Sequence, residues 1–255
     1  MRLENRNFRL IARLDVKGRD LIKGRQFEGV RVLGAPNEFA RRYYADGVDE
    51  LFYIDNVASL YDRNHLSELL ADVLPGVFVP VTVGGGIRSV DDVRTLLLAG
   101  ADKIALNTAA VKNPDLTSEI ARAFGSQCVV LSIEAKKRAE GVWEVMVDGG
   151  REPTGLDVLT WVRESAARGV GEIFVTSIDA DGLERGMDLE LAGAVAEASE
   201  VPVVASGGVG QTKHVRALVQ ETSVDGVAVG SALHYGHLSL QDLKLSDLNE
   251  GIPDA

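Results

Sequence analysis

The 255-residue sequence predicts a single closed (β/α)8 TIM barrel, an α/β fold with one domain over residues 1–255. The first observation is a strand–loop–helix–strand unit at residues 79–108, whose first apolar run is rich in β-branched residues and ends on three glycines. The second is that residues 201–231 repeat this unit, roughly half a chain later. The third is the length, which suits a barrel made of two half-barrels, approximately 1–125 and 126–255, with four strand-like segments in each.

The first half-barrel is expected to begin with a strand at residues 9–15, which ends on Asp15. The stretch 16–35 is longer than most βα loops, so we expect a lid or binding loop there. Ser89 is the expected N-cap of the third helix, because Asp91 and Asp92 in its first turn suit the helix dipole. The remaining elements of this half are a helix at 37–46, a strand at 50–55, a loop at 56–64, a helix from Leu66, a strand at 79–83, a strand at 103–106 and a helix at 115–124.

The second half-barrel is expected to begin with a strand at residues 128–134, the counterpart of the first strand, which ends on Glu134. The charged run 135–138 is expected to be solvated, and residues 142–147 alternate like a hairpin strand. The remaining elements are helices at 156–168, 189–198 and 212–219, strands at 172–177, 201–206 and 224–230, and a final helix at 240–249.

Composition excludes several classes of partner. The net charge of −11 argues against a broad nucleic-acid footprint and against attraction to anionic membranes. No apolar run has membrane-spanning length, and the N-terminus is too charged for a signal peptide. Cys128, the single cysteine, excludes an internal disulfide and fits a reducing compartment. We therefore expect a cytoplasmic protein without nucleic-acid or membrane partners, and the side-chain spacing predicts neither a metal nor a cofactor.

Two clusters of glycine and small polar residues at strand ends are candidate phosphate sites. Glycine lets the backbone approach a ligand closely, and helix N-termini direct N–H groups toward negative charge. The alternative is that these glycines only form tight turns. Two clusters on opposite sides of one barrel mouth favour an elongated substrate with a phosphate at each end. The candidates are Gly84, Gly85, Gly86, Asn107 and Thr108 after strands three and four, and Ser206, Gly207, Gly208, Gly230 and Ser231 after strands seven and eight.

Asp15 and Glu134 are the candidate catalytic residues, because equivalent strand ends in the two halves would face each other across the mouth. Two carboxylates in different environments can divide the roles of acid and base. The alternative is that each caps a loop or neutralises a lysine. Other residues near strand ends, Asp55, Ser177 and Asp179, are substrate-binding candidates, whereas a surface role is expected for His234.

Four charged residues lie at the opposite ends of the strands. Because the starts of parallel strands meet at the bottom of a barrel, these side chains are expected to gather there. From the residues alone, a salt-bridged plug is the favoured interpretation. The four are Arg9, Glu50, Lys103 and Glu172.

Several motifs, spread over nearly the whole chain, together resemble the cyclase subunit of imidazole glycerol phosphate synthase (HisF). The resemblance implies that ammonia from a glutaminase subunit (HisH) adds to a phosphoribulosyl-formimino aminoimidazole carboxamide ribotide. The products are imidazole glycerol phosphate and an aminoimidazole carboxamide nucleotide. The motifs are Leu14-Asp15-Val16-Lys17, Thr82-Val83-Gly84-Gly85-Gly86-Ile87-Arg88, Gly100-Ala101-Asp102-Lys103, Phe124-Gly125-Ser126-Gln127, Thr176-Ser177-Ile178-Asp179 and Ala205-Ser206-Gly207-Gly208.

The same resemblance implies roles for individual residues. Asp15 matches the acid/base on strand one, and the four charged residues at the bottom match a gate through which ammonia enters from a glutaminase at the N-terminal face. Three features depart from the family pattern. Glu134 stands where the family has an aspartate, Arg13 where it usually has a small residue, and the loop 56–61 differs.

These departures leave alternatives to the histidine-pathway cyclase. The nearest is a paralogue that keeps the ammonia channel but amidates a bacterial surface sugar, with altered or no cyclase activity. A second is a glutaminase-docking scaffold without chemistry of its own. A third is the isomerase sibling of the family, which would leave the gate residues unexplained.

Overall fold

The structure, a computed structural model, describes residues 8–55 and 66–244. The loop 56–64, whose sequence departs from the family pattern, lies outside the described residues. So does the later part of the helix expected at 240–249. The described part of that helix contains only a 3-10 turn, η2 (Gln241–Leu243), and Ser239, two residues before this turn, bonds to Asp242 within it.

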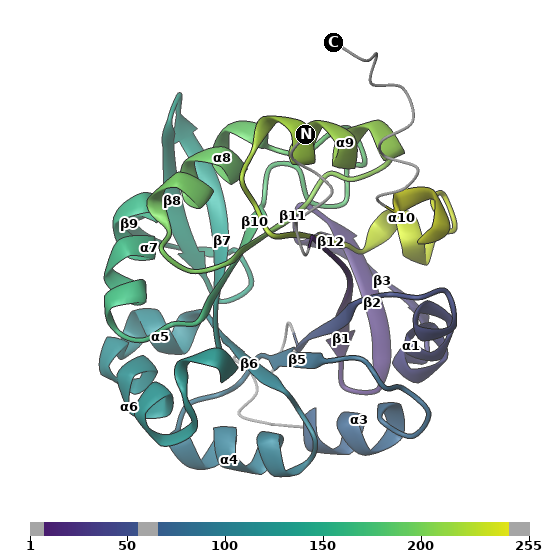
Figure 1. The fold of residues 1–255 in the computed structure, drawn as a ribbon, viewed down its shortest axis with the longest axis horizontal. Coiled ribbons are helices and arrows are strands. Elements are labelled where there is room, and N and C mark those ends of the chain that lie inside the picture. The colour runs from purple at the N-terminus through teal and green to yellow at the C-terminus, as the bar shows by residue number, and fades with distance from the viewer. Residues whose placement is uncertain (1–7, 56–65, 245–255) are drawn as a thin grey trace.

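Eight parallel strands close into the predicted (β/α)8 barrel, since the last strand pairs with the first (Figure 1). Each pairs in parallel register with its neighbours, and helices surround the ring. The fold class is therefore confirmed. In order around the barrel the strands are β1 (Arg9–Lys17), β4 (Glu50–Asp55), β5 (Val81–Gly84), β6 (Lys103–Leu106), β7 (Val129–Ala139), β10 (Glu172–Ser177), β11 (Val203–Ser206) and β12 (Gly226–Val229).

The outer helices begin and end close to the predicted positions. Ser89 caps α4 as expected, with its side chain accepting from the Asp92 N–H and the Asp92 carboxylate accepting from the Ser89 N–H. Short helices follow β6 and β12, and a 3-10 turn precedes β7. The helices are α1 (Pro36–Ala45), α3 (Leu66–Val73), α4 (Val90–Leu98), α5 (Thr108–Lys112), α6 (Pro114–Phe124), η1 (Ser126–Cys128), α7 (Val158–Ala167), α8 (Leu189–Ala198), α9 (Thr212–Glu221) and α10 (Ser231–His234).

Two sets of antiparallel strands extend from the C-terminal ends of β1 and β7, at the mouth of the barrel. The stretch expected as a long loop is instead a hairpin, β2 (Asp20–Arg25) and β3 (Glu28–Gly34), which continues from β1. The run 135–138 is the continuation of β7 and pairs with β8 (Val142–Val147), and its charged residues Lys137 and Arg138 are exposed as expected. A further strand, β9 (Glu152–Asp157), was missed because Pro153 and Gly155 are unfavourable in a strand interior.

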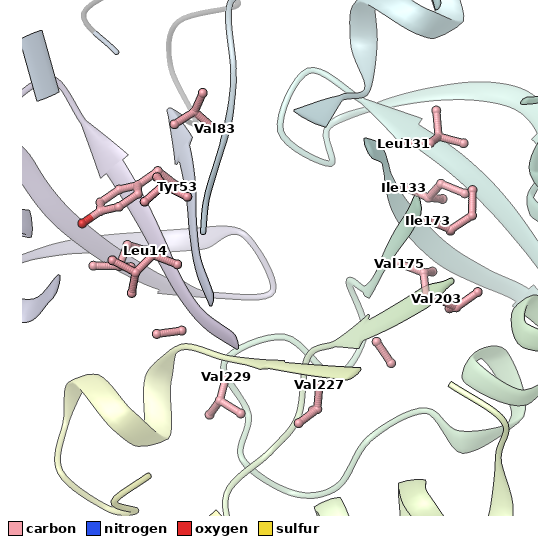
Figure 2. Close-up of a cluster of buried hydrophobic side chains, with 14 of the residues drawn as sticks. Leu14, Tyr53, Val83, Leu131, Ile133, Ile173, Val175, Val203, Val227 and Val229 are labelled. Atoms are coloured by element: carbon pink, nitrogen blue, oxygen red, sulfur yellow. The ribbon is translucent and has the colours of Figure 1, made fainter. Parts of the chain in front are cut away.

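Side chains on the barrel strands alternate between two layers. The outward residues pack against the helices, and Figure 2 shows this layer, with Leu14, Tyr53, Val83 and Leu131 among its buried side chains. Burial of this apolar surface supplies the main driving force for closing the barrel. The inward residues meet on the axis, where Ile11 and Phe52 belong to a second, smaller cluster.

Aspartates bond to strand starts at the bottom of the barrel. The Asp102 carboxylate accepts from the Val81 N–H at 2.8 Å, and Asp225, its counterpart in the second half, accepts from the Val203 N–H at 2.8 Å. Each bond satisfies a backbone donor at the point where one strand begins beside the next.

We expect Asp225→Ala to lower the free energy of unfolding by about 1–3 kcal/mol, because it leaves the Val203 N–H without its acceptor. Asp225→Asn keeps an oxygen at the same place and should lose less. Urea unfolding of both variants measures the difference. Equal losses for the two would contradict this assignment of the bond.

Candidate active site

The four charged residues expected at the bottom of the barrel form one closed ring of ion pairs. Arg9 Nη1 lies 2.9 Å from Glu50 Oε2 and 3.2 Å from Glu172 Oε2. Lys103 Nζ joins the same two carboxylates at 2.8 and 2.9 Å. Thr82 Oγ1 donates to the other oxygen of Glu50 at 2.6 Å. The predicted gathering is confirmed, and charge alternates around the bottom of the axis.

At the top of the axis, Asp15 is held between two buried cations. Arg13 Nε donates to its Oδ1 at 2.9 Å and Lys23 Nζ to its Oδ2 at 3.0 Å. Burial alone would raise the pKa of Asp15, but the charges of Arg13 and Lys23 outweigh burial and lower the pKa well below its usual value. Asp15 is therefore a carboxylate throughout the physiological pH range.

Lys23 and Asp181 complete this network and were missed from the sequence. Lys23 Nζ contacts both carboxylate oxygens of Asp181, at 3.0 and 3.1 Å, and all four side chains of the network are nearly fully buried. Lys23 lies in β2, within the stretch expected as a loop, so only the hairpin brings it back to Asp15. The β2 sequence, DLIKGR, does not alternate between polar and apolar residues, so periodicity gave no local signal for this strand.

Glu134 ends the barrel portion of β7, in a strand opposite β1. Its side chain is buried, and its Oε2 has no hydrogen-bond partner among the described residues. Burial, with smaller contributions from Asp15 and Asp181, raises the pKa of Glu134 to about 7, against the opposing effects of Arg13 and of a backbone hydrogen bond from Gly150. Near neutral pH this side chain exists in both protonation states, so it can donate or accept a proton.

Hairpin β2–β3 covers the mouth between these acids. Its tip, Gln26 and Phe27, has positive φ angles of 50° and 65° and bonds to the loop after β10 through Gln26 N–H and Asp181 O at 2.8 Å. Below the hairpin a cavity of about 130 Å³ is lined by Asp15, Lys23, Phe27, Gly149 and Asp181. The expectation of a binding or covering segment here is consistent with this position, although the segment is a hairpin.

The two candidate phosphate clusters each line a cavity at the mouth. Gly85, Asn107 and Thr108 share one of about 60 Å³ with Asp55 and Glu134. The second cluster lines a narrow space with Arg13 and Lys23, and a cavity of about 400 Å³ that includes Ser231 adjoins it. The members of this second cluster are Ser206, Gly207, Gly208, Gly230 and Ser231.

At two of these positions the neighbouring backbone leaves no room for a side chain, so only glycine fits. Gly85 has φ 103°, and an added Cβ would lie 2.3 Å from Asp55 O. Gly208 has φ 92°, and its Cβ would lie 1.9 Å from Gly186 O. The side chains of Asn107 and Thr108 already bond to Met146 O and to the Asp148 N–H. The Thr108 hydroxyl, which accepts in this bond, can still donate, and the Asn107 amide has a second N–H. Phosphate binding stays a prediction.

The structure places the two remaining substrate-binding candidates, whose role stays a prediction, and it corrects the expectation for His234. The Ser177 hydroxyl lies 3.5 Å from Asp188, the N-cap of α8, because alternation along β10 turns Thr176 and not Ser177 toward the axis. Asp179 lies at the rim, ion-paired to Lys136, with the Lys137 N–H also donating to it. His234 is buried rather than on the surface. It bonds to the Tyr43 hydroxyl at 2.6 Å, and burial, aided by Lys23, lowers its pKa to about 3.

Within residues 8–55 and 66–244, no three His, Cys, Asp or Glu side chains are arranged to hold a metal ion. In the same ranges, no helix is long and apolar enough to cross a membrane.

The raised pKa of Glu134 predicts a pH-dependent effect on stability. The folded protein binds this proton more tightly than the unfolded chain, so stability falls as pH rises from 4.5 to about 7. Glu134→Gln cannot ionise, and above pH 7 it should be more stable than the wild type by up to about 3 kcal/mol. The gain should vanish toward pH 4.5. Urea unfolding across this range, with exposed Glu140→Gln as the control, measures it; a pH-independent difference would count against the raised pKa.

Comparison with known proteins agrees with this geometry. The family model described as histidine biosynthesis protein matches residues 9–239. The chain is 61% identical to the imidazole glycerol phosphate synthase subunit HisF of Legionella pneumophila, over 80% of this chain and 97% of the relative. It is 50% identical to the subunit of the same name from Myxococcus xanthus, over 92% of this chain and 93% of the relative. The chain belongs to the histidine biosynthesis protein family, within the group of HisF subunits.

Proposed function

We propose that this chain is the cyclase subunit of an imidazole glycerol phosphate synthase. It would use ammonia from a glutaminase subunit to convert the phosphoribulosyl-formimino bisphosphate to imidazole glycerol phosphate and an aminoimidazole carboxamide nucleotide. The observation that carries the proposal is the pair Asp15 and Glu134 at one barrel mouth, between two glycine-lined cavities. The relatives named above are subunits of that synthase, so the comparisons do not support the alternative of surface-sugar amidation.

The two cavities suit the two ends of a bisphosphate. On one side, backbone N–H groups around Gly85 and Thr108 are the proposed ligands, with the Thr108 hydroxyl and the second N–H of the Asn107 amide as further donors. On the other, the glycines beside Ser206 and Ser231 allow backbone groups to approach an anion closely. Arg13, Lys23 and Asp181 line the same space, with the two cations paired to Asp15 and Asp181. A substrate held at both ends would cross the mouth between Asp15 and Glu134.

The two acids are suited to different steps. Asp15, kept ionised by Arg13 and Lys23, can stabilise positive charge that develops on the attacking nitrogen and accept its proton. Glu134, with its pKa near neutrality, can donate a proton to the departing nitrogen. Because Arg13 helps to lower the pKa of Asp15, Asp15 stays ionised and cannot donate a proton. We therefore assign proton donation to Glu134.

The bottom face is the proposed docking site of the glutaminase. Two large apolar side chains there are among the most exposed in the described structure, Phe78 at 81% and Leu98 at 83%. Phe78 lies in the connection that leads into β5, and Leu98 is the last residue of α4, before β6; the Tyr44 ring packs on Phe78 at 6.0 Å. Exposed apolar groups beside a charged opening are typical of a protein interface.

The expected cytoplasmic location rests on the lone, free Cys128 and stays a prediction.

Turnover of the bisphosphate with an ammonium salt, without any partner, tests the cyclase assignment. We expect the wild type to be active and Asp15→Asn to lose about 10²–10⁴-fold in kcat, because the amide can no longer accept the proton. Asp91→Asn, an exposed aspartate on α4, is the control, and thermal unfolding checks that Asp15→Asn folds. An inactive wild type, or an Asp15→Asn variant with full activity, would contradict the proposal.

Lys103→Met tests the route of nitrogen through the bottom face. The change removes one cation from the ring of ion pairs but lies far from the mouth along β6. We expect glutamine-dependent turnover with the glutaminase subunit to fall several-fold while ammonium-dependent turnover is retained. Comparable losses with both nitrogen sources would argue against a gate.

A further inference from the structure

The axis between the charged ring and the mouth is occupied by a layer of apolar side chains. This middle layer forms a cluster of its own, separate from the outer core. Its members are inward-facing residues from strands around the barrel, and all are at most 3% exposed. They are Ile11, Phe52, Ala105, Val130, Phe174, Val204 and Ala228. The centre of the ring of strands in Figure 1, where only ribbons are drawn, is therefore filled.

Two phenylalanine rings meet across this layer. Phe52 lies on β4 and Phe174 on β10, and these strands stand four places apart in the closed order of eight. The rings come from opposite walls of the barrel, stacked with centroids 3.8 Å apart and planes 12° from parallel. Both are 1% exposed. Stacked rings from opposite walls must lie on or beside the axis, and we call this pair the ring plug.

Arg13 forms a second tier above the ring plug. Its guanidinium carbon lies 5.9 Å from the centre of the Phe174 ring, and its Nη1 donates to Thr176 Oγ1 at 2.8 Å. Since Arg13 comes from β1 and Thr176 from β10, this bond spans the barrel directly over the rings. The bottom and the mouth are thus separated by two rings and one guanidinium.

The composition of this barrier decides what can cross it. An ammonium ion would lose its hydration in this apolar layer without gaining a hydrogen-bonding partner, and the free-energy cost would be large. Only neutral ammonia is therefore expected to cross the layer. Barrel interiors are filled cores, and the two stacked rings, each 1% exposed, lie across the axis. Passage requires the two rings to separate.

We propose that the ring plug is the constriction that limits transfer of ammonia from the bottom face to the mouth, so that Phe52 and Phe174 set the balance between glutamine and free ammonium as nitrogen sources. This inference rests on the proposed function. It adds to that function a barrier formed by two named side chains, between the charged ring and the two acids.

The test compares nitrogen sources in the complex with the glutaminase subunit. The measured quantity is the ratio of glutamine-dependent to ammonium-dependent turnover for wild type, Phe52→Val, Phe174→Leu and the double variant. We expect the double variant to raise the ratio about tenfold, equivalent to lowering the barrier to passage by about 1.4 kcal/mol. An unchanged or lower ratio would overturn the proposal.

Tyr53→Leu is the matched control. Tyr53 follows Phe52 on the same strand and is equally buried, but it belongs to the outer layer shown in Figure 2. The change leaves a cavity of similar kind off the axis, so the ratio should stay at the wild-type value. A rise in the ratio for Tyr53→Leu would also overturn the proposal, because it would assign the effect to general loosening of the barrel.

A second measurement does not depend on turnover. Apolar cavities bind xenon, so crystals of the double variant under xenon pressure should show it on the axis between Ile11 and Val204, and wild-type crystals should not. Xenon at this level in the wild type, or none in the double variant, would overturn the ring plug. If every protein is inactive with ammonium, the proposed function fails and the xenon result still decides whether the axis is closed.

Discussion

The alternation of side chains along strands of a closed parallel barrel is the constraint on which the other features depend. Along β4, Leu51 and Tyr53 pack against the helices, while Glu50 and Phe52 point to the axis. One six-residue strand thus supplies the outer core, an ion pair at the bottom and half of the ring plug. Because the strands are parallel, inward-facing residues at equivalent strand positions lie at the same height along the axis. They form three layers: ion pairs at the bottom, apolar side chains in the middle and ion pairs again at the mouth.

Charge balance at the mouth accounts for the different states of its acids. Two buried cations, Arg13 and Lys23, pair with two carboxylates, Asp15 and Asp181. Glu134 is a third buried acid without a paired cation of its own, and desolvation therefore favours its neutral form. The unusual Arg13 is thus part of the reason why Asp15 and Glu134 differ. It also lies over the ring plug, so one side chain influences both the acids and the axial barrier.

The half-barrel repeat extends into the excursions at the top. Strands β1 and β7, equivalent in the two halves, both run past the barrel into antiparallel pairs with β2 and β8. The first excursion returns Lys23 to Asp15, and the second places the Gly149–Gly150 turn near Phe27 and Glu134. These two excursions convert an open barrel end into a covered site.

The periodicity of the sequence determined the barrel itself. Strands such as Glu50–Asp55 and Glu172–Ser177 and the capped start of α4 were predictable, because apolar alternation and capping are local signals. The charged ring and the two glycine clusters were also predictable, since parallel strands bring their equivalent ends together. The hairpin β2–β3 was not recognised, and with it Lys23 was missed.

Only the tertiary structure decided which polar side chains face the axis and which charges pair there. It turned Thr176 inward and Ser177 outward, buried His234, paired Asp181 with Lys23 and paired Asp179 with Lys136. It also brought Phe52 and Phe174 into contact from positions more than a hundred residues apart in the chain. Such contacts depend on strand order and stagger around the closed barrel, and pKa values depend on the burial that closure creates. Neither is encoded in any local stretch of the chain.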